Sequence, residues 1–540
     1  MTGAPTYAAP MAPDLIADPE TDPTATYAVD PALVRRLARR VVAAPRATHH
    51  VSHTPMTGAP LASLPLSTRE DVVVAVDAAR AAQRSWARTP MELRERILLR
   101  YHDLVLERQV ELLDVVQLES GKTRLQAFEE VADVALVARH YARNAASYLR
   151  PRRRTGLFPV LTQSTEHHHP RGVVGIVSPW NYPLSLAITD ALPALMAGNA
   201  VVLRPDLQAS LTALQAVQLL TEAGLPESVL QVVLGDGENV GQAVVDLADY
   251  VCFTGSTSTG RRVAASVATR LAGYSLELGG KNSMYVADDA DLDKAVQGAV
   301  RACFSSAGQL CISVERLLVH ASVVDEFRTR FVAAVEAMTL GPALAYGTDM
   351  GSLVSAAQLA RVSDHVDDAR AKGATVLTGG RARPDLGPWF YEPTVLEGVT
   401  AAMDVRDDET FGPVVSLYTV HGDDEAVRAA NDTDYGLNAS VWTRDTARGR
   451  RVATAIEAGT VNVNEGYAAA WGSVAAPMGG MKQSGVGRRH GSEGILKYTE
   501  SQNVTVQHVL PIAPVAGLSD EAYARVMTAA LRTLKAVGRR

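Results

Sequence analysis

The sequence has few cysteines, no excess of positive charge and no long apolar run. Three cysteines among 540 residues are too few, and odd in number, for a disulfide framework, so each thiol is judged by its surroundings. The 52 basic residues are outnumbered by 59 acidic ones, for a formal net charge of −7, which excludes a general attraction for nucleic-acid phosphates. No stretch of about 18 uncharged apolar residues occurs, so a membrane span is not expected.

The N-terminal residues also lack the features of a targeting segment. Residues 1–30 are rich in Ala, Pro, Asp and Thr and carry no basic stretch followed by an apolar run, unlike a secretory signal. We therefore expect residues 1–44 to form a mobile tail and the protein to be cytoplasmic, with neither a membrane nor a nucleic acid as partner. The remaining length fits two to four structural units.

Residues 67–149 have a helical pattern. The spacing of Ser67 and Glu70 is that of a capping box, in which a hydroxyl and a carboxylate satisfy free amides of the first helical turn. Pro90 favours a second helix start, and Gly121 is expected to end the long helix that follows.

Residues 173–280 alternate short β-branched runs with helical stretches. The runs are 173–177, 201–203, 229–233, 250–254 and 274–278. Their spacing is that of βαβ units and predicts a doubly wound parallel sheet, whose ligand-binding residues follow the carboxyl ends of the strands. Residues 281–480 again mix strands and helices. Near the C-terminus, residues 504–510 are expected to form a half-buried strand and 522–537 the last helix.

Cys311 is the thiol with the strongest case for chemistry. A cysteine within a core element is usually a small hydrophobic residue, and Cys252 and Cys303 are expected to be of that kind. Gly308 and Gln309 favour a turn directly before Cys311, which would present its sulfur to a substrate as a nucleophilic thiolate.

Two polar residues at strand ends are candidate partners for this thiol. Glu277 ends a predicted strand between two leucines, and burial there would raise its pKa toward that of a useful general base. Asn181 follows the strand 173–177 and carries an amide that can donate to a developing oxyanion.

Taken together, the motifs resemble those of the NAD(P)-dependent aldehyde dehydrogenase superfamily. They occur in the family's order and extend over most of residues 83–499. The matching segments are 179–184, 198–205, 253–257 with Gly260, 276–281, 304–311, 409–414 and 479–485. Within the family, the segments 311–316 and 485–491 are most similar to the actinobacterial branch of succinate-semialdehyde dehydrogenases.

The resemblance implies oxidation of an aldehyde to a carboxylic acid through a thiohemiacetal and a thioester on Cys311. Asn181 and the backbone amide of Cys311 would hold the oxyanion, and Glu277 would activate the hydrolytic water. The implied cofactor contacts are Pro179, Trp180, Arg204, Asp206, Gly235, Gly255, Ser256, Leu278, Glu409 and Phe411. Among these, Glu409 would hold the nicotinamide ribose, with Phe411 packed beside it.

Two departures from the family pattern bear on the cofactor. Arg204 precedes Pro205 where the family has a lysine, and Leu207 replaces a glutamate that binds ribose in NAD-preferring members. Loss of that carboxylate removes repulsion toward a 2′-phosphate, which Arg204 can pair bidentately. We therefore expect NADP as cofactor, with NAD as the alternative and the pyrophosphate at the helix N-terminus near Gly255 and Ser256.

The resemblance also implies the domain organisation. The expected units are a mobile tail (1–44), an NAD(P)-binding domain (45–150 and 171–279), a catalytic domain (280–480), a small β oligomerisation element (151–170 and 497–511) and a C-terminal helical extension (512–540). The fold class is therefore α/β, with a doubly wound Rossmann-type cofactor domain beside an α/β catalytic domain. A homodimer or homotetramer is expected.

The substrate is expected to be a small aldehyde, and the resemblance favours succinate semialdehyde. In better-known members two arginines hold the succinate carboxylate, but this chain has Thr189 and Ser305 near those positions. Only the serine partner is matched, by Ser473. The alternatives are oxidation of another aldehyde and a catalytically silent binding protein on the same fold. Transfer of the acyl group to coenzyme A is disfavoured by the presence of Glu277.

Histidines cluster at 49–53 and at 167–169. Adjacent histidines on a strand point to opposite faces, and no cysteine or carboxylate has the spacing of a zinc site. We therefore expect no metal.

Overall fold

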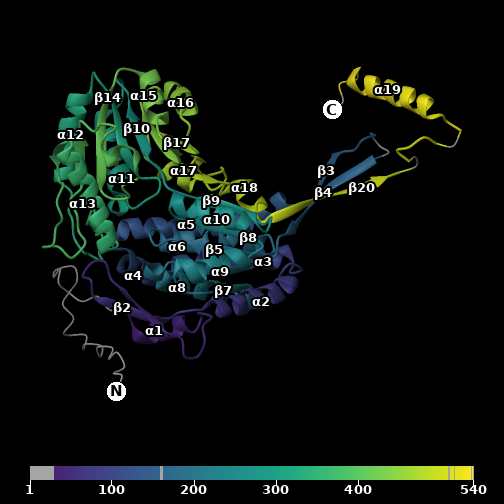
Figure 1. The fold of residues 1–540 in the computed structure, drawn as a ribbon, viewed down its shortest axis with the longest axis horizontal. Coiled ribbons are helices and arrows are strands. Elements are labelled where there is room, and N and C mark those ends of the chain that lie inside the picture. The colour runs from purple at the N-terminus through teal and green to yellow at the C-terminus, as the bar shows by residue number, and fades with distance from the viewer. Residues whose placement is uncertain (1–28, 159–161, 509–510, 516, 537, 539–540) are drawn as a thin grey trace.

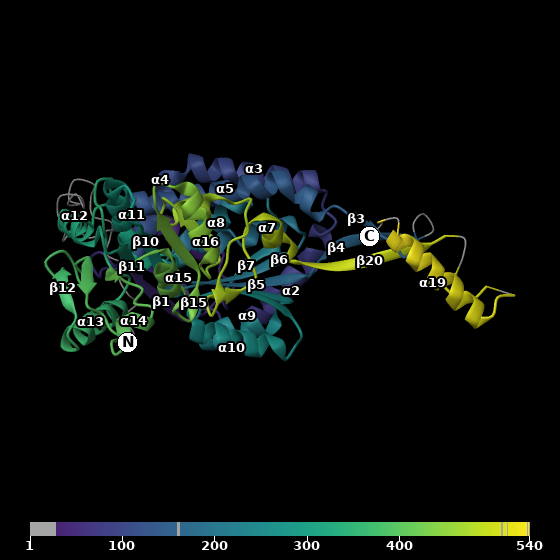
Figure 2. The same ribbon diagram turned by 90° about the horizontal axis from the view of Figure 1, so that it is seen from above.

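The structure is a computed structural model that describes residues 29–158, 162–508, 511–515, 517–536 and 538. Two α/β bodies lie against each other, and a three-stranded sheet extends from them with the last helix at its far end (Figure 1, Figure 2). None of the helices in these ranges is at once long enough and apolar enough to cross a membrane.

The first body is built on a six-stranded sheet. Its strands are β5 (Val173–Ser178), β6 (Ala200–Pro205), β7 (Leu230–Val232), β8 (Tyr250–Thr254), β9 (Gly273–Glu277) and β19 (Gly485–Val486). The order β19-β9-β8-β5-β6-β7, antiparallel only at β19, confirms the five predicted parallel strands. From β5 the chain adds β6 and β7 on one side and then β8 and β9 on the other. This reversal creates a topological switch point at the carboxyl ends of β5 and β8.

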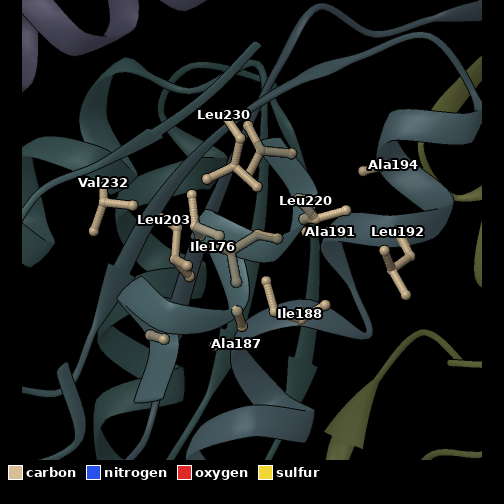
Figure 3. Packing of buried hydrophobic residues seen from close by; sticks show 14 of the residues in the cluster. Ile176, Ala187, Ile188, Ala191, Leu192, Ala194, Leu203, Leu220, Leu230 and Val232 are labelled. Carbon is tan, nitrogen blue, oxygen red and sulfur yellow. The ribbon is translucent and has the colours of Figure 1, made fainter. Parts of the chain in front are cut away.

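Helices bury this sheet and hold its strand ends in place. Figure 3 shows Ile176, Leu203 and Leu230, from the three strands β5 to β7, packed with Ile188 and Leu220 of neighbouring helices. Because helices cover the sheet, β5 and β6 are buried at every residue rather than alternating. The helices of this body are α2 (Arg69–Trp86), α3 (Met91–Glu107), α4 (Gln109–Ser120), α5 (Arg124–Leu149), α6 (Pro183–Ile188), α7 (Ala191–Met196), α8 (Ser210–Glu222), α9 (Gln242–Leu247) and α10 (Thr257–Ala268).

The start of α2 differs from the prediction by one residue. The capping box is formed by Thr68 and Asp71, with the Thr68 amide donating to the Asp71 carboxylate at 2.8 Å. Ser67 instead donates to the Val42 carbonyl at 2.6 Å, so a tertiary contact removes it from the cap. Gly121 ends α4 with φ of 74°, as predicted, although the helix before it is broken into α3 and α4.

The structure contradicts the predicted mobile tail from residue 29, the first described residue, onward. α1 (Pro31–Ala38) buries Val34 and Leu37 in the core of the first body. The hairpin of β1 (His49–His53) and β2 (Pro60–Pro65) follows. Residues 29–44 are thus packed on the fold, and the prediction of a tail is wrong for them, while residues 1–28 lie outside the described residues.

The second body is built on a seven-stranded sheet in the order β12-β13-β14-β11-β10-β16-β17. Its strands are β10 (Asn282–Val286), β11 (Val314–His320), β12 (Thr375–Thr378), β13 (Thr394–Glu397), β14 (Val414–Val420), β16 (Asn438–Trp442) and β17 (Thr460–Val463). Only β12 pairs antiparallel. Its helices are α11 (Leu292–Phe304), α12 (Val324–Glu336), α13 (Ala356–Ala371), α14 (Asp404–Asp407), α15 (Asp423–Asn431), α16 (Thr446–Ala455) and α17 (Ala468–Gly472). The later helix α18 (Gly491–Leu496) packs on α5 and α7 of the first body.

The third element is the extending sheet, in the order β20-β4-β3. β3 (Arg152–Thr155), β4 (Thr162–Pro170) and β20 (Thr499–Gln507) pair antiparallel, and α19 (Asp520–Ala536) lies beyond them (Figure 1). The predicted C-terminal strand therefore begins earlier than residue 504, and residues 509–510 are outside the described part. A role of this sheet in oligomerisation, like the domain boundaries, stays a prediction.

Candidate active site

A cleft of about 560 Å³ opens at the switch point of the first sheet. Its walls are the loops after β5, β8 and β9 together with loops of the second body. The predicted site residues that line it are Pro179, Trp180, Asn181, Gly255, Ser256, Glu277, Leu278, Cys311, Glu409 and Phe411. The cleft thus collects the candidate nucleophile, base and oxyanion donor in one space.

Cys311 lies on a bend, as predicted. The bend follows the short helix η5 (Ser305–Gly308), where residues 306–308 have left-handed φ angles of 51°, 54° and 70°. Such a run is unfavourable for residues with a Cβ. A neighbour stabilises it, because the Ser306 hydroxyl hydrogen-bonds with the hydroxyl of Tyr182 at 3.1 Å.

The three thiols differ in exposure. Cys252 and Cys303 are buried, as expected, whereas Cys311 is a partly exposed residue that lines the cleft. Burial, together with the nearby carboxylates of Glu409 and Glu277, raises the pKa of Cys311 to about 12. The group is therefore a thiol at neutral pH, and nucleophilic attack needs a base that accepts its proton.

The substitution Gly308→Ala is expected to damage both stability and activity. A Cβ at Gly308 would lie 2.0 Å from the carbonyl oxygen of Gly412, in a backbone conformation that already disfavours alanine. Together these effects cost at least about 3 kcal/mol and displace the Cys311 bend, which should lower kcat by about 10²-fold. Thermal unfolding and steady-state kinetics measure the two effects. The matched control is Gly341→Ala, since no atom lies within 4 Å of the added Cβ; equal behaviour of the two variants would contradict the prediction.

Glu277 ends β9 and faces the cleft. Its Oε1 atom is buried and has no hydrogen-bond partner among the described residues. Burial is the largest cause that raises the pKa of Glu277 to about 7, against the opposing charges of Arg489 and Lys497. A carboxyl group that is half ionised near neutral pH, with a free oxygen at a cleft, is well suited to accept a proton.

Asn181 joins the end of β5 to the cysteine bend. Its side-chain amide donates to the carbonyl of Gln309 at 3.1 Å, and the nitrogen carries a second hydrogen for a ligand oxygen. The backbone carbonyl of Asn181 accepts from Lys122 at 2.8 Å, and Lys122 pairs with the buried Glu130 at 2.6 Å. No motif indicated this ion pair, which fixes the strand end that carries the amide.

The outer part of the cleft has the features of a dinucleotide site. α10 begins there with Ser256 as its N-cap, so the positive end of the helix dipole faces the cleft. On the opposite wall, Glu409 accepts a hydrogen bond from the amide of Gly280 at 2.9 Å, and burial raises its pKa to about 8. Phe411 packs edge-on against Trp180, with ring centroids 5.6 Å apart.

Glu315 holds the loop that carries Glu409 and Phe411. Its carboxylate accepts hydrogen bonds from the amides of Thr410 and Phe411, both at 3.0 Å, and forms a buried ion pair with Lys281. Phe411 has a left-handed φ of 55°, which these bonds stabilise. The sequence signal that could have indicated this role is the adjacent charged pair Glu315 and Arg316 at the start of a predominantly apolar strand.

Arg204, Asp206 and Gly235 meet one another but do not line the cleft. The Arg204 guanidinium is buried and donates twice to the Gly235 carbonyl, at 3.0 and 2.6 Å, with Asp206 at 3.8 Å. The three residues lie at the carboxyl ends of β6 and β7, next to the switch point. These predicted cofactor contacts therefore lie together, but the Arg204 guanidinium already bonds to groups of the protein.

Ser473 is not brought to the cleft. Its side chain is exposed and donates to the Ala469 carbonyl at 2.7 Å. The apolar residues that do pack against Cys311 include Tyr182, which contacts Trp471 edge-on at 5.1 Å between centroids. This aromatic surface could not be predicted from the sequence, because its members come from distant segments.

The histidine clusters do not form a metal centre in the described part of the chain. His167 and His169 stack on one face of β4, with ring centroids 6.5 Å apart. Within those residues, no three side chains of the metal-ligating types His, Cys, Asp and Glu converge.

Comparison with known proteins identifies the family. The sequence profile described as "Aldehyde dehydrogenase family" matches residues 42–504. The chain belongs to the aldehyde dehydrogenase family. This membership accounts for the two α/β bodies and confirms the predicted fold class.

Relatives of this family are similar over most of their length. A protein of Mycolicibacterium smegmatis named "Putative succinate-semialdehyde dehydrogenase (NADP(+))" is 53% identical over 479 residues, 89% of this chain and 93% of that protein. The crystal structure of an E. coli NADP dependent enzyme is 34% identical with a TM-score of 0.83, covering 88% of this chain and 99% of that chain. Betaine aldehyde dehydrogenase of Staphylococcus aureus, in complex with NAD+, is 30% identical with a TM-score of 0.83, covering 91% and 98%.

Proposed function

We propose that this chain oxidises an aldehyde to a carboxylic acid with NADP as the hydride acceptor. The observation that carries the proposal is the single cleft that the partly exposed thiol of Cys311 and the unpartnered carboxyl oxygen of Glu277 both line. A nucleophile and a base with a pKa of about 7 in one space are the parts that acyl transfer to water requires. Membership of the aldehyde dehydrogenase family supports the same reaction.

Each residue of the cleft has its own role in the proposed reaction. The sulfur of Cys311 attacks the carbonyl carbon while its proton passes to the Glu277 carboxylate, and the resulting oxyanion accepts hydrogen bonds from the Asn181 side chain and the Cys311 amide. Oxidised NADP held in this cleft would supply the acceptor for the hydride of this carbon, and the substrate would then be bound to Cys311 as a thioester. After Glu277 has returned its proton to solvent, it removes a proton from the water that attacks the thioester, and the acid leaves as Cys311 regains a proton.

The cleft fits a nicotinamide dinucleotide. Gly279 leaves room beside Glu409, since a Cβ there would lie 2.3 Å from the Glu409 carboxylate. In this proposal the first turn of α10, at Ser256, holds the pyrophosphate, Glu409 holds the nicotinamide ribose and Phe411 borders the ring. The name of the M. smegmatis relative supports NADP over NAD.

The proposed substrate is succinate semialdehyde. Its support is the name of the M. smegmatis relative, 53% identical to this chain. At the positions near which better-known members have arginines, the hydroxyl of Thr189 accepts a hydrogen bond from Arg489 at 2.5 Å and that of Ser305 accepts from Tyr467 at 3.0 Å. A guanidinium therefore does lie beside Thr189.

A panel of semialdehydes and neutral aldehydes, each assayed with NADP and with NAD, tests the proposal. We expect the highest kcat/KM for succinate semialdehyde with NADP. A higher kcat/KM with NAD would overturn the cofactor, and a neutral aldehyde as best substrate would overturn the substrate. Absence of nucleotide reduction with every aldehyde, in freshly reduced protein that binds NADP, would favour the silent binding protein.

The assembly is also proposed to be a homodimer or homotetramer. The support is the extending sheet, whose outer strands β3 and β20 each have one edge that pairs with no described strand. Strand edges of this kind form contacts with other chains. A cytoplasmic location is part of the same proposal.

A further inference from the structure

A buried ion pair connects the helices α4 and α5 to the segment that carries Asn181. Lys122, in the link between these helices, lies 2.6 Å from the carboxylate of Glu130 on α5, and their side chains are only 2% and 0% exposed. Burying two charges costs desolvation energy, which a pair recovers only where further hydrogen bonds satisfy both groups. Both side chains make such bonds, and all of them go to residues 181–185.

The ammonium group of Lys122 contacts two consecutive residues of this segment. It donates a hydrogen bond to the backbone carbonyl of Asn181 at 2.8 Å. Asn181 is 5% exposed, so without a donor this carbonyl would be an unpaired buried acceptor, at a cost of about 1–3 kcal/mol. The same Nζ atom lies 3.6 Å from the ring centroid of Tyr182.

The carboxylate of Glu130 fixes the chain on the other side of Tyr182. Its Oε2 atom accepts hydrogen bonds from the backbone amides of Leu184 at 2.8 Å and Ser185 at 3.0 Å. These amides belong to the first turn of α6, where a helix supplies no acceptor of its own. The ion pair therefore holds both the carbonyl of Asn181 and the start of α6, which leaves the backbone between them little freedom.

We propose that Lys122 is a positioning residue for the oxyanion donor: together with Glu130 it fixes the backbone at Asn181, so that the side-chain amide stays directed into the cleft beside Cys311. The inference rests on the proposed function and deepens it. Asn181 and Cys311 line the same cleft, and the amide of Asn181 donates to the carbonyl of Gln309 at 3.1 Å. A catalytic group displaced by about 1 Å loses on the order of 10²-fold in rate, so a rigid backbone at this position bears directly on catalysis.

Lys122 has a second route to the nucleophile, through Tyr182. The hydroxyl of Tyr182 hydrogen-bonds with that of Ser306 at 3.1 Å, within the left-handed bend before Cys311. The two routes differ once the amide of Asn181 has been removed. If Lys122 acts through Asn181, its loss then costs nothing further, whereas a loss that acts through the bend has its full effect with or without the amide.

The test combines the double variant K122M/E130Q with Asn181→Ala. The double variant removes the hydrogen bond to Asn181 without leaving an unpaired buried charge, and a glutamine at position 130 keeps an oxygen for the amides of α6. We expect kcat/KM for succinate semialdehyde, at saturating NADP, to fall by about 10-fold in K122M/E130Q and by about 10²- to 10³-fold in Asn181→Ala. The triple variant should lie within about twofold of Asn181→Ala, and the dissociation constant of NADP, from fluorescence titration, should change less than about twofold in all three.

A further tenfold fall in the triple variant would overturn the inference in favour of the route through the bend. If K122M/E130Q does not fold, Lys122→Met alone is compared with Asn181→Ala in the same way, because the Glu130 carboxyl can then take up a proton.

The matched control is Arg448→Met. Arg448 on α16 pairs with Asp423 at 2.6 Å and with Asp288 at 2.7 Å, and it does not line the cleft. Its replacement also breaks a charged contact, so thermal unfolding should occur at a lower temperature while kcat/KM changes less than about twofold. A fall in kcat/KM as large as that of K122M/E130Q would show a general loss of stability and overturn the inference.

A crystal structure of K122M/E130Q separates failure of this inference from failure of the proposed function, because it needs no turnover. We expect the distance from Nδ2 of Asn181 to the Gln309 carbonyl oxygen, 3.1 Å in the unaltered chain, to exceed hydrogen-bond range. An Asn181 side chain that stays in place would overturn the inference whether or not the protein oxidises aldehydes. A displaced side chain in a protein that oxidises no aldehyde would support the positioning by Lys122 and refute the proposed function alone.

Discussion

Replacement of Cys311 with alanine is expected to abolish aldehyde oxidation while NADP binding is retained. Cys311 is the only partly exposed cysteine among the described residues, and it lines the same cleft as Glu277 and Asn181. The loss in kcat should be on the order of 10⁴-fold or more. Stopped-flow measurement of nucleotide reduction gives the rate, and fluorescence titration gives the dissociation constant of NADP.

The matched control for this variant is Cys303→Ala. Cys303 lies on α11, eight residues before Cys311, and its thiol is buried away from the cleft. Its loss removes a core contact of about 1 kcal/mol and should change kcat less than threefold. Steady turnover by Cys311→Ala, or equal loss in both variants, would rule out Cys311 as the nucleophile.

The substitution Glu277→Gln is expected to separate the two halves of the reaction. Glutamine preserves the shape of the side chain but accepts no proton, so the thioester forms and is not hydrolysed at the normal rate. One equivalent of reduced nucleotide per active subunit should appear first, more slowly than in the unaltered enzyme because Glu277 also takes the proton of Cys311, followed by turnover reduced by about 10²- to 10⁴-fold. Rapid-mixing spectroscopy of nucleotide reduction measures both phases.

The amplitude of the burst of reduced nucleotide decides whether Glu277 acts in hydrolysis. Because the carboxylate also takes the proton of Cys311, we expect the rate of the burst to recover at high pH, where the thiol ionises without a base. A variant that shows no burst at any pH and yet binds NADP would contradict the assignment of Glu277 to hydrolysis. Steady turnover at the unaltered rate would contradict any role as a base.

Much of the first body and the cysteine bend could be predicted because their signals are local. Each strand of the first sheet is a short apolar run followed by a turn, and Gly308 directly precedes the bend at Cys311. The capping box was placed one residue early because Ser67 and Thr68 both have the required spacing. Only the contact of Ser67 with Val42, which is tertiary, decides between them.

The charges around Glu277 could not be predicted in this way. Asp190 and Arg489 form an ion pair although they are about 300 residues apart in the sequence, and neither lies in a pattern that indicates its partner. Residues 31–38 were likewise assigned to a tail from their composition, although Val34 and Leu37 have helical spacing. Ser473 was chosen by resemblance alone, and the turn of its side chain to Ala469 depends on the local path of α17.

The bend of left-handed residues before Cys311 depends on contacts with segments that are synthesised later. Gln309 is held by the Ser352 carbonyl and the Val354 amide, and Gly308 packs under the carbonyl of Gly412. A nascent chain that ends before residue 412 lacks the contact of Gly308 with the Gly412 carbonyl. The full set of contacts around the bend can therefore form only after that residue has been added to the chain.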